Sequence, residues 1–264
     1  VGEMPKPKSM RDRLIGIPFW IHSFETVITQ TYRHLPVAVT RGGYIALGEK
    51  EKSKALEFLN EIMSTLLVLD TAVHVIREND LDEVTFTEHG HRVHGSTTSL
   101  RSLLVTHTGA TIIPKEKMIK AIKWAETLTL DVRLKTLLLL SLEFHTHLAN
   151  SEYKQALVMG WVILEDFHIK DTWASEIAKV TSDQDRISKL GSWDIDRKLE
   201  ALNISHVLTN DQYDLLMRIK DARNKTVHEG KEPAREIVEE CSRLVSDVTQ
   251  KRVGTGLGSM ASRL

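Results

Sequence analysis

The sequence predicts an all-α protein, with a bundle of four or five helices in its C-terminal half and a mostly helical N-terminal region before it. Two observations favour helices over sheets. Only 14 Gly and 6 Pro occur among the 264 residues, which is few for a chain of many short strands and turns. Apolar residues also recur at spacings of three and four over long stretches, as they do on one face of a helix.

The N-terminal region, residues 1–112, is expected to be helical in two places. Apolar residues at helical spacing predict a long helix within residues 49–78. A second helix is predicted over residues 19–34, closed by Pro36. Residues 84–98 favour an irregular loop or a short hairpin. The sequence assigns this region no role beyond that of a possible sensor, regulator or dimerisation module.

The C-terminal bundle is expected to span residues 113–250, after a boundary near residues 111–115. Residues 251–264 are rich in glycine and predict a flexible tail. Thr209 and Gln212 form a capping-box pattern, Gly230 is placed to end a helix, and Pro233 is placed to begin the next. Helices are expected at residues 115–148, with a break near 127–131, and at 152–168, 172–180, 195–202, 209–228 and 233–248.

Composition narrows the possible partners. The chain has 35 Lys and Arg against 36 Asp and Glu, so any surface that binds nucleic acid must be a local basic patch. Cys241 is the single cysteine, which excludes an internal disulfide and favours a cytoplasmic protein. The apolar runs are too short to span a membrane, so no membrane partner is expected. The first residue is Val1 rather than methionine, as expected of a fragment or a processed chain.

One residue breaks the amphipathic pattern of the helix predicted over residues 209–228. On a helical wheel, Arg223 falls on the apolar stripe, close to Leu216 and Ile219. A guanidinium in that position is costly unless it is paired, solvated in a cleft or facing a partner. Two explanations stay open: a structural ion pair with a core carboxylate such as Glu165, or a functional site.

The residues after Arg223 form a pattern of their own. Asn224 follows the arginine directly, and His228 comes five positions after it, just before Gly230 and an amphipathic helix that starts with proline. This pattern resembles the signature of the higher-eukaryote-and-prokaryote nucleotide-binding (HEPN) superfamily, and most of all its ApeA-like branch in bacterial defence proteins. The helix that ends at residues 162–165 resembles the preceding core helix of that branch. The resemblance covers roughly residues 115–248 and implies a HEPN-like bundle.

The resemblance implies an endoribonuclease that needs no metal ion and no cofactor. The catalytic residues would be Arg223, Asn224 and His228, and Lys225 would bind the substrate. His228 could move a proton at the ribose 2′-OH or at the leaving 5′-oxygen, because an imidazole titrates near pH 7. Arg223 would stabilise the charge that develops on the phosphorus, and Asn224 would orient the phosphate or the imidazole. The products would carry a 2′,3′-cyclic phosphate and a 5′-OH.

A single copy of this helix makes a poor pocket, since Arg223 and His228 are about 140° apart on the wheel. Members of the resembled family pair two bundles so that both motifs line one cleft. The expected partners are therefore an RNA substrate and a second copy of the chain, in a homodimer with a composite active site. The resemblance also implies a role in prokaryotic defence or as a toxin-type effector.

Other functions remain open from the sequence. A catalytically inactive HEPN bundle could bind nucleotide or RNA, or serve as a protein-interaction module. A helical interaction protein without any active site could hold Arg223 in an ion pair, and His228 could simply favour the negative end of the helix dipole. A cluster of histidines at positions 89, 91 and 94 offers a weaker possibility, a metal site.

Overall fold

The computed structural model describes residues 13–17, 26–40, 45–49, 51–86, 92–94, 113–128 and 130–261. The chain divides into two compact units, Val1–Lys135 and Thr136–Leu264, and each is described here by itself. Over the described residues the chain is mostly helical, as predicted. No helix in these ranges is both long enough and apolar enough to cross a membrane.

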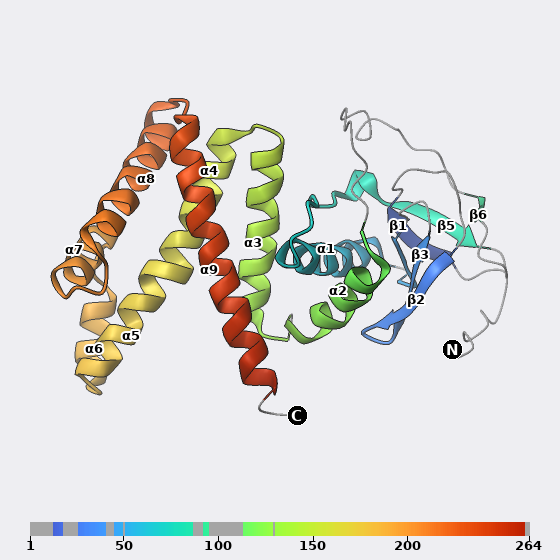
Figure 1. Ribbon diagram of the computed structural model, residues 1–264, viewed down its shortest axis with the longest axis horizontal. Helices are drawn as coiled ribbons and strands as arrows, with labels where there is room; N and C mark the ends of the chain where they lie inside the picture. The colour runs from blue at the N-terminus through green and yellow to red at the C-terminus, as the bar shows by residue number, and fades with distance from the viewer. Residues whose placement is uncertain are drawn as a thin grey trace. The chain divides into compact units, whose positions relative to one another are not determined.

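The N-terminal unit contains an antiparallel sheet. Six strands in the described ranges pair in the order β2-β3-β4-β1-β5-β6. The strands are β1 (Arg13–Ile17), β2 (Thr26–Tyr32), β3 (Leu35–Thr40), β4 (Ile45–Leu47), β5 (Asp82–Phe86) and β6 (Arg92–His94). Helix α1 (Lys52–Val68) packs on helix α2 (Lys115–Leu128), and α2 contacts β2 (Figure 1). A short 3-10 helix, Glu78–Asp80, precedes β5.

A buried carboxylate joins the β2–β3 hairpin to α1. The side chain of Glu61 is fully buried, and it accepts a hydrogen bond from Arg33 Nη2 at 3.1 Å. Lys135 Nζ lies 2.6 Å from the same carboxylate, and the hydroxyl of Tyr32 donates to it as well. With two cations and a hydroxyl around it, Glu61 meets the condition under which a buried charge is tolerated.

The prediction of a mostly helical N-terminal region is wrong. Residues 26–32 form a strand where a helix was expected, because three threonines, a valine and an isoleucine occupy this stretch and β-branched side chains favour strands. Arg33 and His34 form the tight turn to β3 with φ angles of 48° and 68°. Helix α1 is also shorter than residues 49–78. The short hairpin predicted within residues 84–98 is confirmed, since β5 pairs with β6.

The compact units divide after Lys135, whereas the sequence placed the domain boundary between residues 112 and 113. The reason is the packing of α2. Its buried residues contact α1 and β2, so this helix belongs to the N-terminal unit and not to the bundle. The predicted break near residues 127–131 is confirmed, because α2 ends at Leu128 and the next helix begins at Val132.

The described residues of the C-terminal unit form helices joined by loops, with no strand among them, as predicted. Its helices are α3 (Val132–Ala149), whose residues up to Lys135 fall in the N-terminal unit, α4 (Tyr153–Ile163), α5 (Lys170–Val180), α6 (Gln184–Gly191), α7 (Ile195–Ile204), α8 (Asn210–Glu229) and α9 (Arg235–Ala261). A π-helical segment, Leu164–Ile169, joins α4 to α5 without a break. Near the end of α6, the ring of Trp193 stacks on that of Trp173 from α5, with centroids 5.4 Å apart.

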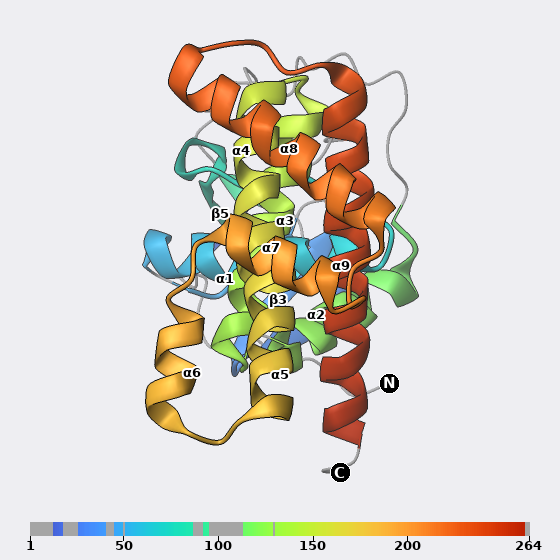
Figure 2. The ribbon, with the colours of Figure 1, turned by 90° about the vertical axis from the view of Figure 1, so that its left-hand side faces the viewer.

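Helix α4 lies at the centre of this unit. It contacts both α8 and α9, and Figure 2 shows α8 crossing over it. Gly160 lets the helices approach closely, because a Cβ at this position would lie 2.6 Å from Cys241 Sγ of α9 and 2.9 Å from the ring of Phe144 of α3. Burial raises the pKa of the Cys241 thiol to about 12, so this cysteine is a packing residue.

The prediction of a flexible tail over residues 251–264 is wrong as far as Ala261, where α9 ends. Tertiary contacts explain the difference. Val253 is buried, and Arg252 Nη2 donates to the carbonyl oxygen of Phe167 at 3.2 Å and pairs with Asp171. These contacts outweigh the low helix propensity of the glycines in the segment.

Candidate functional site

Helix α8 carries the predicted site, and both of its ends are fixed as the sequence predicts. Thr209 Oγ1 accepts from the backbone N–H of Gln212 at 3.2 Å, and Gln212 Oε1 accepts from the N–H of Thr209 at 3.0 Å. This is the predicted capping box. At the other end Gly230 adopts the left-handed conformation, with φ 67°, and its N–H donates to Lys225 O. The turn that bears His228 is therefore a defined helix end.

Arg223 lies on the buried face of α8, as the helical wheel predicts. Leu216, Ile219 and Thr226 are buried on this face, and Arg223 is half-buried among them. Its Nη1 donates to Asn224 Oδ1 at 3.1 Å. Its Nε is buried and has no hydrogen-bond partner in the described part of the chain.

The guanidinium of Arg223 has no carboxylate partner among the residues that the structure describes. Within the described ranges, no Asp or Glu oxygen lies within 4.0 Å of it. The expected structural partner, Glu165, is engaged elsewhere: its Oε1 lies 2.9 Å from Lys170 Nζ, and its Oε2 accepts from Trp161 Nε1 at 2.8 Å. An ion pair between Arg223 and Glu165 is therefore not what holds the arginine on this face.

The predicted catalytic residues form a small patch on two successive turns of α8. Asn224 and His228 are four residues apart, as are Arg223 and Val227, and side chains at this spacing are neighbours on a helix. Asn224 is half-buried, His228 is exposed, and 47% of the Val227 surface is exposed. The structure thus brings Arg223 and Asn224 into direct contact and leaves His228 open to solvent one turn beyond Asn224.

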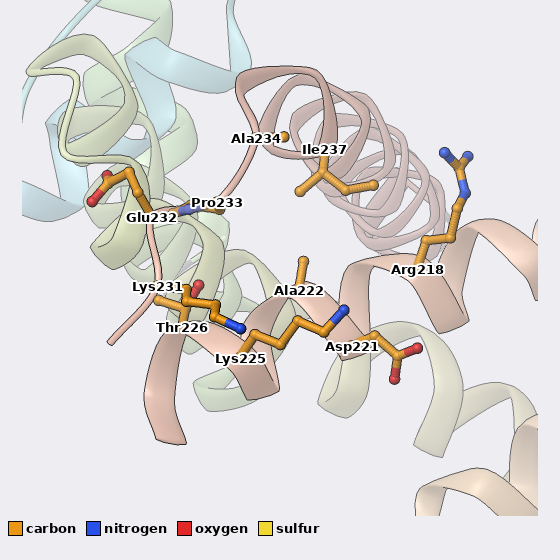
Figure 3. A pocket seen from close by; sticks show the side chains of 10 residues that line it. All are labelled: Arg218, Asp221, Ala222, Lys225, Thr226, Lys231, Glu232, Pro233, Ala234 and Ile237. Carbon is orange, nitrogen blue, oxygen red and sulfur yellow. The ribbon is translucent and has the colours of Figure 1, made fainter. Parts of the chain in front are cut away.

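A groove of about 350 Å³ lies between α8 and the start of α9 (Figure 3). Lys225 lines it, whereas the three predicted catalytic residues do not. Two other lysines lie near the motif in the sequence, Lys220 and Lys231. The structure separates them: Lys231 also lines the groove, and Lys220 pairs with Asp196 of α7.

Sequence reasoning missed this groove. Its apolar lining comes from the two helices and the loop between them, namely Ala222, Thr226, Pro233, Ala234 and Ile237. Each of these residues looks ordinary in the sequence, because small and apolar side chains are common on amphipathic helices. In the sequence, only Lys225 and Lys231, the two lysines that line the groove, pointed to it.

The histidines outside α8 do not form a metal site in the described residues, where no group of three or more His, Cys, Asp or Glu side chains is placed to hold an ion. Of the predicted cluster, His89 and His91 lie outside the described residues, as does the side chain of His94. Burial lowers the pKa of His145 and of His168, and for His168 the nearby Lys251 and Arg252 lower it further.

Comparisons of the chain with protein-family models, with curated proteins and with solved structures gave no match. A function for this chain is therefore inferred from the pattern of residues in α8 and from their surroundings.

Proposed function

We propose that the C-terminal helical unit is a metal-independent endoribonuclease. Arg223, Asn224 and His228 are its catalytic residues, and Lys225 binds the substrate. One observation carries the proposal: a half-buried guanidinium on α8 that has no carboxylate partner in the described ranges. Arginine presents two or more N–H donors in a planar fork that suits a phosphate, and an un-neutralised guanidinium keeps its full charge for such a ligand.

The proposed reaction uses the ribose of the substrate as the nucleophile. His228 takes the proton of the 2′-OH, the 2′-oxygen bonds to phosphorus, and the bond from phosphorus to the 5′-oxygen breaks. The leaving 5′-oxygen takes up a proton from water, which gives a 5′-OH end and a 2′,3′-cyclic phosphate end, and the imidazolium of His228 returns its proton to water. Arg223 stabilises the negative charge on the phosphoryl oxygens in the transition state, and Asn224 holds the guanidinium in place through its Oδ1.

The proposed enzyme works as a homodimer with a composite site. The patch on α8 is a helix surface and not a cleft, so a second surface is needed to exclude water from the reacting phosphate. Val227 lies beside Arg223 and exposes 47% of its surface, which gives an apolar point of contact for the second copy. The family resemblance implies the same pairing and a role as a prokaryotic defence or toxin-type effector.

The test is incubation of the protein with mixed RNA in excess EDTA, with analysis of the product ends. We expect 2′,3′-cyclic phosphate termini from the parent and at least a hundredfold slower cleavage from Arg223→Ala and His228→Ala, about the size of a lost charge stabiliser or general base. Arg186→Ala and His206→Asn are matched controls, because both residues are exposed and lie outside the patch. Asparagine suits position 206, where φ is 58°.

Equal cleavage by the parent and both site variants would refute the assignment of the site. RNA in which every 2′-OH is methylated must resist the parent, since the proposed nucleophile is then blocked. Cleavage of this RNA would refute the mechanism even if the site variants were inactive.

A second candidate function is a bundle that binds RNA without cutting it. Its support is specific: Arg223 bonds to Asn224 and not to His228, and none of the catalytic candidates lines the groove. The same experiment separates the two functions, because a binding protein would retain RNA in EDTA and leave its ends unchanged.

A further inference from the structure

The groove between α8 and the start of α9 has the size, charge and lining of a nucleotide subsite. We infer that it binds the nucleotide next to the cleaved linkage, with the phosphate at the ammonium group of Lys225 and the base or ribose against the apolar lining. This inference rests on the proposed function, since it adds a second contact for the same RNA strand.

The size of the groove limits what it can hold. Its volume of about 350 Å³ is at the lower end of the range for small-molecule pockets. Ala222 of α8 and Ile237 of α9 face the space together with Pro233 and Ala234 of the connecting loop (Figure 3). An apolar lining of this kind suits the flat face of one unstacked base, as found in proteins that bind single strands.

The charge of the groove favours a phosphate. Lys225 has no carboxylate within 4.0 Å in the described residues, so its ammonium group is available to a ligand. Lys231 is held 2.5 Å from Glu229, and Glu232 is held 3.1 Å from Lys154. Figure 3 shows the two ammonium groups between the carboxylate of Glu232 and that of Asp221. A ligand in the middle of the groove therefore meets the ammonium group of Lys225.

The first turn of α9 adds to this charge. Ala234, the residue before α9, accepts the first bonds of the helix from the N–H groups of Ile237 and Val238. The N–H groups of Arg235 and Glu236 in the same turn have no earlier helical carbonyl to bind. A helix of this length carries partial positive charge at its N-terminus, where anions are favoured.

Lys225 connects the groove to the catalytic patch. It lies three residues before His228 on α8, and residues at this spacing are neighbours on a helix. An RNA strand whose reacting 2′-OH lies at His228 therefore passes Lys225 before its next nucleotide enters the groove. The order of contacts along the strand is His228, Lys225, groove.

The test uses two variants, one that fills the groove with a large side chain and one that removes the ammonium group of Lys225. Ala234→Trp places an indole in the groove, and Ala178→Trp on α5 is its control, since both alanines are exposed. Lys225→Gln is compared with Lys189→Gln, an exposed lysine of α6. The probe is a fluorescent oligonucleotide with 2′-deoxyribose at every position, which cannot be cleaved by the proposed reaction, and its binding is followed by anisotropy.

We expect Ala234→Trp and Lys225→Gln to weaken binding of the probe and to raise KM for RNA cleavage about tenfold, the effect of one lost charge-assisted contact, with kcat within about twofold of the parent. The control variants should match the parent. Unchanged binding and KM in Ala234→Trp, with a parent that cleaves RNA, would overturn the subsite and leave the proposed function in place. A parent that does not cleave RNA would overturn the proposed function, and the groove would then be judged by probe binding alone.

Discussion

Replacement of Arg223 by methionine tests whether this arginine contributes to function or to the stability of the fold. Methionine keeps most of the apolar stem on the buried face of α8 and removes the guanidinium. The variant loses one hydrogen bond, from Nη1 to Asn224 Oδ1, which contributes about 1 kcal/mol. It also removes the buried, unpartnered Nε, whose desolvation costs about 1–3 kcal/mol in the parent. No carboxylate is left behind without its partner.

Together these contributions predict that the unfolding free energy of the variant equals that of the parent or exceeds it by up to about 2 kcal/mol. If Arg223 belonged to a buried ion pair, its removal would instead lower the unfolding free energy by about 3–5 kcal/mol. Urea unfolding followed by circular dichroism measures the difference, provided that the m-value stays constant. Arg252→Met is the matched control and should be destabilised, because Arg252 pairs with Asp171 and binds a backbone carbonyl. A loss of more than about 3 kcal/mol in Arg223→Met would refute this reasoning.

Two further predictions concern the stability of the C-terminal unit. Gly160→Ala should lower the unfolding free energy by about 1–3 kcal/mol, because the new Cβ would lie 2.6 Å from Cys241 Sγ. Gly191→Ala is the control and should leave it unchanged, because a Cβ there meets nothing within 4 Å. Equal urea midpoints for the two variants would contradict this prediction. Acidification from pH 7 to pH 5 should also destabilise the protein, because burial lowers the pKa of His145 and His168 in the folded state and the unfolded chain takes up protons first as the pH falls below about 6.5. A urea midpoint that stays constant between these pH values would contradict the second prediction.

The helices of the C-terminal unit could be predicted because their signals are local. Thr209, Gln212 and Gly230 specify the ends of α8 through bonds within a few residues of themselves. The N-terminal sheet lacked such a signal. Its β2–β3 turn uses Arg33 and His34 at positive φ, where glycine or asparagine would have marked a hairpin.

The candidate site, too, could be predicted from the sequence only in part. The position of Arg223 on the buried face follows from the helical period and could be predicted. Glu165 binds Trp161, four residues before it, and Lys170, five residues after it, in the π-helical segment, whose geometry the α-helical period of the sequence does not predict. The groove was missed because Ala222 and Ile237 come from two helices and meet only in the folded unit.

The π-helical segment Leu164–Ile169 lets the chain lose one residue here without turning α5. A π-turn contains about one residue more than an α-turn, so the deletion of one residue within it would restore α geometry and leave the following side chains on the same faces. Trp173 would then keep the face on which it stacks with Trp193. The deletion of one residue in the first turn of α5, which holds no extra residue, would instead turn every following side chain by about 100°.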